Sequence, residues 1–272
     1  MSQSTPLLTL MFAALPALAF AESAPLPSPH PGSPAQSSQA ATEQKPWSVT
    51  VGLGIIYGSL YEGGAERKLF PLPTIEATYY NWSLGFDGLR YHFIDTEKFA
   101  MGAGVGYDFG RKDSKLPKNR RGLGDVKGGA AVSLFAQYYP LDALGLSLDA
   151  TQSYGDSDSL LITVGAGSGF PLYGESLIGD IGISAIWADD AHMRSYYSVS
   201  PQQSARSGLR RFTAESGIKS ANLSAGVTYV ISERWAWSLN GSVEILQGDA
   251  ADSPVVEGDT QPFVASMLTY TF

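Results

Sequence analysis

The three histidines and the acidic residues near them are the side chains best suited to metal binding or proton transfer, because the chain has no cysteine. His192 closely follows Asp189 and Asp190, a grouping able to bind a cation weakly. A metal centre or a serine triad needs a histidine beside its partners, and His30 and His92 lie far away in the sequence. We therefore expect His192 to lie in a solvated loop.

Two other segments carry residue types found at active sites. Residues 153–159 read Ser-Tyr-Gly-Asp-Ser-Asp-Ser, superficially like a serine-hydrolase block, but this polar composition is more typical of an outer loop. Asp249, Asp252 and Glu257 offer carboxylates for a hard cation, such as one that bridges lipopolysaccharide. Three acids in one loop are weak evidence, so we predict no catalytic residue, no metal site and no cofactor.

Positive charges gather in two segments, although the chain has a net charge of -8. The first group is Arg206, Arg210 and Arg211, and the second is Arg111, Lys112, Lys115, Lys118, Arg120 and Arg121. Such loops could contact lipopolysaccharide phosphates or attract anionic solutes, and simple solvated loops explain them equally well. The acidic balance argues against nucleic acid as a partner.

The composition indicates which elements position these residues. Only 16% of the 272 residues are charged, below the roughly 25% of soluble domains. Glycine (30), tyrosine (14) and phenylalanine (12) are abundant, while the mean hydropathy of -0.03 excludes a helical membrane protein. A barrel with one apolar and one polar face fits this balance.

The N-terminal segment predicts export. Residues 7–20 form an apolar run of signal-peptide length, and Ala19-Phe20-Ala21 supplies a cleavage site, so residues 1–21 are the expected signal peptide. No lysine or arginine precedes the run, and a buried N-terminal helix is the alternative. Residues 22–46, rich in proline, serine and alanine, predict a disordered linker.

From residue 47 onward, apolar and small or polar residues alternate. Trp47, Val49, Val51, Leu53, Ile55 and Tyr57 share one face of a segment whose other face carries Ser48, Thr50, Gly52 and Gly54. Similar segments of 10 to 12 residues recur, which suits tilted membrane strands of roughly 9 to 11 residues better than globular strands. We predict a transmembrane antiparallel β-barrel over residues 47–272, with a soluble sandwich as the alternative.

The C-terminal segment resembles the signal read by barrel-assembly machinery, with Leu268, Tyr270 and Phe272 on one face. This last strand must pair with the first to close the barrel. A periplasmic C-terminus makes 110–127, 188–220 and 248–260 outer loops. Counting strands before residue 97 gives an odd total unless 82–93 divides at Asp87-Gly88, a strong hairpin signal. The division predicts about 12 strands.

Two segments of the C-terminal third carry distinctive residues: Tyr196, Tyr197, Ser204, Arg206, Ser207, Gly208 and Leu209, followed by Asp249, Asp252, Ser253 and Pro254. These residues resemble the motifs of the MipA/OmpV family, also called the MltA-interacting protein family, of outer-membrane proteins. Gly110-Arg111 and Gly122-Leu123-Gly124-Asp125 also resemble family segments, whereas Ser198 replaces the usual glycine. The resemblance covers most of residues 47–272.

The resemblance implies a non-enzymatic barrel in the Gram-negative outer membrane, reached through the periplasm. One family member is a scaffold that joins a murein lytic transglycosylase to a penicillin-binding synthase, which makes peptidoglycan assembly the expected context. A narrow porin and a surface adhesin or antigen are the alternatives, and a lipid-acting barrel enzyme is a weaker one. Residues 196–209 could instead fold back as a cap or plug, since arginine stacks on aromatic rings. The small, polar inward residues leave an open and a filled lumen equally possible.

Overall fold

The computed structural model describes residues 46–59 and 61–272. The expected signal peptide, 1–21, and nearly all of the expected linker, 22–46, lie outside these residues. No helix in the described part of the chain is long and apolar enough to cross a membrane.

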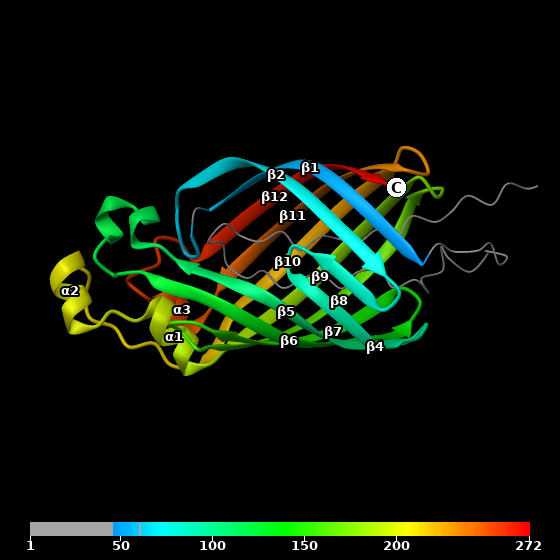
Figure 1. Cartoon of the computed structure of the whole chain (residues 1–272). Coiled ribbons are helices and arrows are strands. Elements are labelled where there is room, and N and C mark those ends of the chain that lie inside the picture. The colour runs from blue at the N-terminus through cyan, green and yellow to red at the C-terminus, as the bar shows by residue number, and fades with distance from the viewer. Residues whose placement is uncertain (1–45, 60) are drawn as a thin grey trace, which may run out of the picture.

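Twelve antiparallel strands form one closed barrel in which neighbours follow the chain order and β1 pairs with β12 (Figure 1). The strands are β1 (Trp47–Ser59), β2 (Arg67–Tyr79), β3 (Trp82–Gly85), β4 (Gly88–Asp95), β5 (Phe99–Arg111), β6 (Val126–Leu141), β7 (Leu144–Tyr154), β8 (Leu160–Tyr173), β9 (Leu177–Ala188), β10 (Gly217–Val230), β11 (Trp235–Leu246) and β12 (Thr260–Thr271). The predicted barrel, its closure and its strand number are confirmed.

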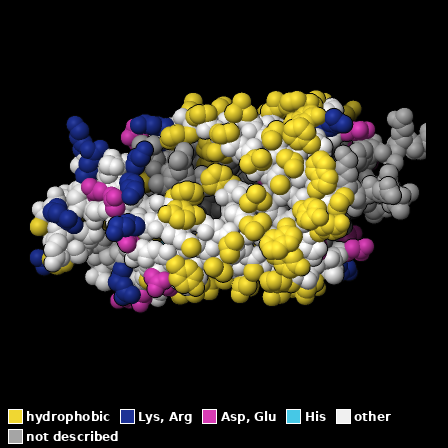
Figure 2. Space-filling view, viewed as in Figure 1, with side chains coloured by type: hydrophobic (Ala, Val, Ile, Leu, Met, Phe, Trp, Pro, Cys, Tyr) yellow, Lys and Arg dark blue, Asp and Glu magenta, His cyan; other side chains and the backbone are white. Residues whose placement is uncertain are grey.

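The alternation in the sequence becomes an outward apolar face and an inward face of polar and small residues. In β1, Leu53 and Ile55 are 66% and 56% exposed, whereas Gly54 and Ile56, which alternate with them, are buried. The same outward exposure recurs around the barrel and produces the broad apolar band visible in Figure 2. So large an apolar surface is stable only against lipid, so the strands span a membrane.

Exposed aromatic side chains mark the end of the barrel that carries the short turns. They include Trp47, Tyr79, Trp82, Tyr138, Trp235 and Phe272. Outer-membrane barrels have such interfacial girdles, with short turns on the periplasmic side and longer loops outside. This end is therefore the periplasmic end, and the C-terminus lies there (Figure 1).

The hairpin of β3 and β4 is much shorter than its neighbours, as the predicted division at Asp87-Gly88 required. Gly88 has a φ of 111°, and a Cβ there would lie 2.1 Å from the carbonyl oxygen of Val105. Only glycine accepts both the conformation and the close approach. At this hairpin the barrel wall consequently ends well short of the outer end of the barrel.

Short helices occur only in the outer connections of the described chain. They are η2 (Asp113–Lys115), η3 (Lys118–Arg120), α1 (Asp190–Tyr197), α2 (Pro201–Ser207) and α3 (Gly248–Asp252). The helical loops join β5 to β6, β9 to β10 and β11 to β12, close to the predicted outer loops. They gather at the end opposite the C-terminus (Figure 1).

Candidate functional site: a folded cap over the outer mouth

Helix α1 turns one face into the barrel mouth. Asp189 caps the helix by accepting a hydrogen bond from the main-chain N–H of His192 at 2.8 Å. The His192 ring stacks on Tyr196 with 4.5 Å between centroids, and His192 is only 5% exposed. Our expectation that His192 lies in a solvated loop was wrong, because the helix buries it under the cap.

Helix α2 explains the serines and glycine of the family motif. Ser200 and Gln203 form a reciprocal capping box at its start. Near its end, the Ser207 hydroxyl donates to the carbonyl of Gln203 at 2.7 Å, and Gly208 takes the left-handed conformation with a φ of 77°. The Ser204 hydroxyl donates to the carbonyl of Leu209, also at 2.7 Å, which fixes the chain as it leaves the helix.

The loop between β5 and β6 is built around two aspartates. The Asp113 carboxylate accepts from the N–H groups of Gly122 and Gly124, at 2.9 and 3.0 Å. Asp125 accepts from the N–H of Asp113 at 2.8 Å and pairs with Lys112, and these contacts hold its pKa below the usual value. The Gly-Leu-Gly-Asp motif is therefore a loop-folding element.

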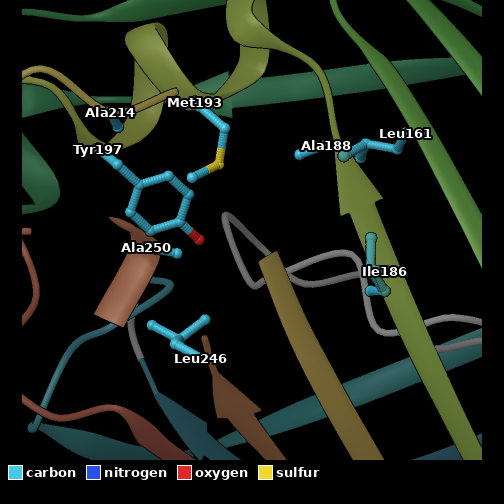
Figure 3. Close-up of a cluster of buried hydrophobic side chains, with 8 residues drawn as sticks. All are labelled: Leu161, Ile186, Ala188, Met193, Tyr197, Ala214, Leu246 and Ala250. Carbon is cyan, nitrogen blue, oxygen red and sulfur yellow. The ribbon is translucent and has the colours of Figure 1, made fainter. Parts of the chain in front are cut away.

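Two clusters of buried apolar side chains join the loops to one another. The first comprises Leu161, Ile186, Ala188, Met193, Tyr197, Ala214, Leu246 and Ala250. Figure 3 shows Met193 and Tyr197 reaching from α1 toward Leu246 and Ala250. Helices α1 and α3 thus pack against the outer ends of β8, β9 and β11.

The second cluster comprises Tyr61, Leu116, Leu123, Val199 and Val255. Three of the contributing loops follow β1, β5 and β9, which lie four strands apart around the closed barrel. Side chains that start from evenly spaced points on the rim can share one cluster only by crossing the mouth. We call this layer, residues 61–66, 112–125, 189–216 and 247–259, the cap.

The two family motifs meet within the cap. The hydroxyl of Ser253 donates to the carbonyl oxygen of Tyr197 at 2.5 Å, and Arg210 donates to the carbonyl of Asp252 at 2.6 Å. Asp249 accepts from the N–H of Glu215 at 2.8 Å. Pro254 is half-buried beside them. The predicted alternative that 196–209 folds back over the barrel agrees with these contacts.

Arg111 does not belong to the exposed basic group in which the sequence placed it. It is 6% exposed and donates to the carbonyl of Tyr196 at 2.8 Å, with its guanidinium 5.8 Å from the centre of that ring. Other members of the two basic groups are exposed: Lys112, Lys115, Lys118, Arg121, Arg206, Arg210 and Arg211. Arg111 therefore ties β5 to α1 rather than facing the medium.

A buried ion pair beneath the cap was missed by sequence reasoning. The Lys219 ammonium lies 2.8 Å from a Glu62 carboxylate oxygen, and the Lys219 side chain is 0% exposed. Burial alone would raise the pKa of Glu62, but Lys219 holds it below the usual value. The nearest signal in the sequence is a lone lysine at the outer start of an otherwise uncharged strand.

The same environment acts on the neighbouring groups of α1. Burial, reinforced by the positive charge of Lys219, lowers the pKa of His192 to about 3. Burial and the Glu62 charge raise the pKa of Tyr197 well above its usual value. Both side chains are therefore neutral at neutral pH.

The remaining candidate residues have structural partners. Glu257 accepts from Ala65 N–H at 3.3 Å and from Asn119 at 3.2 Å, and residues 155–159 form the predicted loop between β7 and β8. In the described ranges, no group of three or more acidic or histidine residues could hold a metal ion.

The C-terminal residues lie at the periplasmic end. Leu268 and Phe272 are 42% and 55% exposed, and the Tyr270 ring packs edge-on against Phe272 with 4.9 Å between centroids. Arg234 donates to the Tyr270 hydroxyl at 3.0 Å. Their use as an assembly signal stays a prediction.

A closed barrel with a lipid-facing band and a folded loop cap defines a transmembrane β-barrel of the outer-membrane class. Residues 51–272 match the family model described as MltA-interacting protein MipA. The chain belongs to this family, as the motifs predicted.

No protein of curated function matches the sequence. Among solved structures, a loop-deletion mutant of OmpT from Vibrio cholerae is 6% identical, with a TM-score of 0.41, covering 83% of this chain and 98% of that one. The KdgM porin is 7% identical, with a TM-score of 0.39, covering 82% and 99%. A bacterial polysaccharide outer membrane secretin is 11% identical, with a TM-score of 0.40, covering 82% and 98%. Likenesses this distant carry no information about function.

Proposed function

We propose that this protein is a non-enzymatic outer-membrane scaffold that holds cell-wall enzymes at its periplasmic end. The observation that carries the proposal is the cap, because a barrel whose outer mouth is bridged by packed loops is poorly suited to free solute flow. The family description, MltA-interacting protein, supports a murein lytic transglycosylase as the partner. The penicillin-binding synthase is added from the family resemblance described in the sequence analysis. The histidines support a non-enzymatic role, since His92 and His192 pack against the rings of Phe135 and Tyr196.

The periplasmic turns offer a surface of suitable chemistry for such partners. Their exposed charged residues are Asp95, Glu97, Asp142, Glu175 and Glu233 on the acidic side and Lys98 and Arg234 on the basic side. This acidic rim would complement a basic patch on an enzyme and speed its encounter with the barrel. At the other end, the exposed lysines of the β5–β6 loop would contact lipopolysaccharide phosphates.

Affinity capture from membranes tests the scaffold with a matched pair of variants. We expect the native chain to recover a transglycosylase or a synthase, and the rim variant Glu97→Lys/Asp142→Lys/Glu175→Lys to lose most of it. The control variant Lys115→Glu/Lys118→Glu reverses charge at the outer end and should keep the enzymes. Repeated recovery of neither enzyme by the folded native chain would refute the scaffold.

A narrow porin is the second candidate, and the polar inward face of the strands favours it. Inward residues such as Ser224, Asn240 and Thr163 suit a water-filled lumen. Planar-bilayer recording separates the two functions: reproducible single-channel steps from the full chain would overturn a purely structural role.

A further inference from the structure

The wall of the barrel is incomplete between β2 and β5. The pairing of β2 with β3 includes only residues 77–79, and the pairing of β4 with β5 ends at Val105. Within the described chain, no strand pairs with residues 67–76 on the side away from β1. Figure 1 shows β2 and β5 diverging from the short hairpin toward the end that carries the helices, and Figure 2 shows an opening between side chains on this face. We call this opening the seam.

Prolines stand along the free edge of β2. The N–H of Phe272 bonds to the carbonyl of Val49, and that of Tyr80 to the carbonyl of Pro46, so even-numbered residues of β1 and β2 face one another. In an antiparallel ladder, the alternate residues point the other way. The main-chain nitrogens of Pro71 and Pro73 therefore face the seam.

A proline nitrogen has no hydrogen to donate, and proline on an edge strand prevents another strand from pairing there. The two prolines remove donors that would otherwise be stranded in lipid. They also disfavour the addition of a strand from a second copy or another protein. The seam is thus maintained by the sequence of β2 itself.

Both rims of the seam are apolar on the membrane side. Leu69 and Ile75 of β2 are 67% and 63% exposed, and Tyr107 of β5 is 59% exposed. These side chains continue the apolar band, so the seam opens into hydrocarbon in the outer half of the membrane. An occupant of the seam must therefore be compatible with hydrocarbon.

The lumen beside the seam is also apolar, unlike much of the inward surface. Ile56, Leu72 and Ala265 form a buried cluster with Phe263 and Met267 packed on it. These residues come from β1, β2 and β12, the strands on the β2 side of the seam. An apolar patch inside the barrel thus borders an apolar opening to the outside.

Charged side chains lie inside the barrel at the foot of the seam. Arg90 pairs with Asp87 of the hairpin tip at 2.7 Å and lies 3.8 Å from Asp149 of β7. Its guanidinium also lies 5.0 Å from the Phe135 ring centre. The apolar lining of the seam therefore ends at this charged group.

We propose that the seam is a lateral port through which the acyl chain of a membrane lipid reaches the lumen from the outer leaflet. The acyl chain enters between the two apolar rims and packs against Phe263 and Met267, the partly buried members of the apolar patch. The cap blocks the axial route at this end, which leaves the side of the barrel as the path to the membrane. This role is independent of the scaffold.

Photo-crosslinking in liposomes that contain an alkyne-tagged lysophospholipid tests the port. Benzoylphenylalanine is placed singly at Leu72 or Met267, which face the lumen beside the seam, and at Ser224, which faces the lumen on β10. Leu69, which faces lipid, is the positive control. Heat-dependent gel mobility reports whether each variant has folded. Two lumen positions are used so that the test can still be made if one of these variants fails to fold.

We expect labelling at 72 and 267 to exceed that at 224 several-fold. Labelling at 72 and 267 no higher than at 224, while 69 is labelled, would overturn the port. Crosslinks from 69 to a second copy of the chain in place of lipid would also overturn it, because they would make the seam a protein interface.

Discussion

The hydroxyl of Ser253 donates a 2.5 Å hydrogen bond to the main-chain carbonyl of Tyr197 and so joins the two family motifs inside the cap. The same hydroxyl accepts from the N–H of Val255 at 3.2 Å. Replacing Ser253 by alanine leaves both buried groups without this partner, at a cost of about 1–3 kcal/mol. We expect Ser253→Ala to lower amide-exchange protection in residues 190–209 while the strands stay protected. The exposed Ser114→Ala is the control, and equal protection in both variants would contradict the link.

The buried pair of Lys219 and Glu62 predicts an asymmetric mutational response. Lys219→Met leaves the Glu62 carboxylate buried without its counter-charge, which typically costs about 3–5 kcal/mol. Adding Glu62→Gln removes that charge and should recover much of the loss. Thermal unfolding followed by gel mobility measures both, and a double variant no more stable than Lys219→Met would argue against the pair.

Acid should loosen the cap. The pKa of His192 is lowered to about 3 in the folded protein from 6.5 in an unfolded chain, so the unfolded state binds more protons between these values. Its contribution to stability is full above pH 6.5, shrinks as pH falls toward 3, and amounts to roughly 5 kcal/mol at most. The pKa of Glu62 is also lowered, so its contribution is lost on acidification as well.

Limited proteolysis of residues 189–216 as a function of pH measures this loosening. We expect faster cleavage below pH 6.5 in the native chain and a weaker pH dependence in His192→Phe, which keeps a ring without a titrating nitrogen. The same pH profile in both proteins would show that His192 does not set the response.

Removing the cap should turn the barrel into a conductor. Replacing residues 190–215 with a short glycine-serine link removes α1 and α2 and with them the contacts that cross the mouth. Bilayer recordings should then show ion-conducting steps that are absent from the full chain. The control is a variant with a shortened loop at 155–159, which contributes to neither apolar cluster. Its bilayer recordings should show no conducting steps.

The short hairpin depends on Gly88. Valine there must adopt a positive φ and place its Cβ 2.1 Å from the Val105 carbonyl oxygen, so barrel assembly should fail or slow markedly. Gly169→Val adds the same bulk where a Cβ meets nothing within 4 Å, and it should assemble normally. Folding yield into detergent micelles measures the difference, and equal yields would remove the steric requirement.

The barrel was predictable because its signal is local and repeated. Alternation such as that of Leu53 to Ile56 assigns each side chain to lipid or lumen without knowledge of its neighbours. The hairpin at Asp87-Gly88 was found from turn chemistry, and the even strand count followed from closure. Helix α2 also follows local rules, since Ser200, Gln203 and Gly208 are ordinary start and stop residues.

The cap could not be predicted in detail, because its contacts join residues that are remote in the sequence. Arg111 and His192 look like loop residues until β5 and α1 come together, and burial then reverses their expected roles. Lys219 meets Glu62 only because barrel closure brings the start of β10 and the β1–β2 loop to the same rim.

The sequence alone therefore determined the class, the membrane-facing surface and the family, all of which rest on short-range periodicity and motifs. Only the tertiary structure decided that the mouth is bridged, that an ion pair is buried beneath the cap, and that the wall between β2 and β5 is open. The physical reason is that burial and pairing depend on which distant segments barrel closure places side by side. The alternation of residues along one strand does not specify those neighbours.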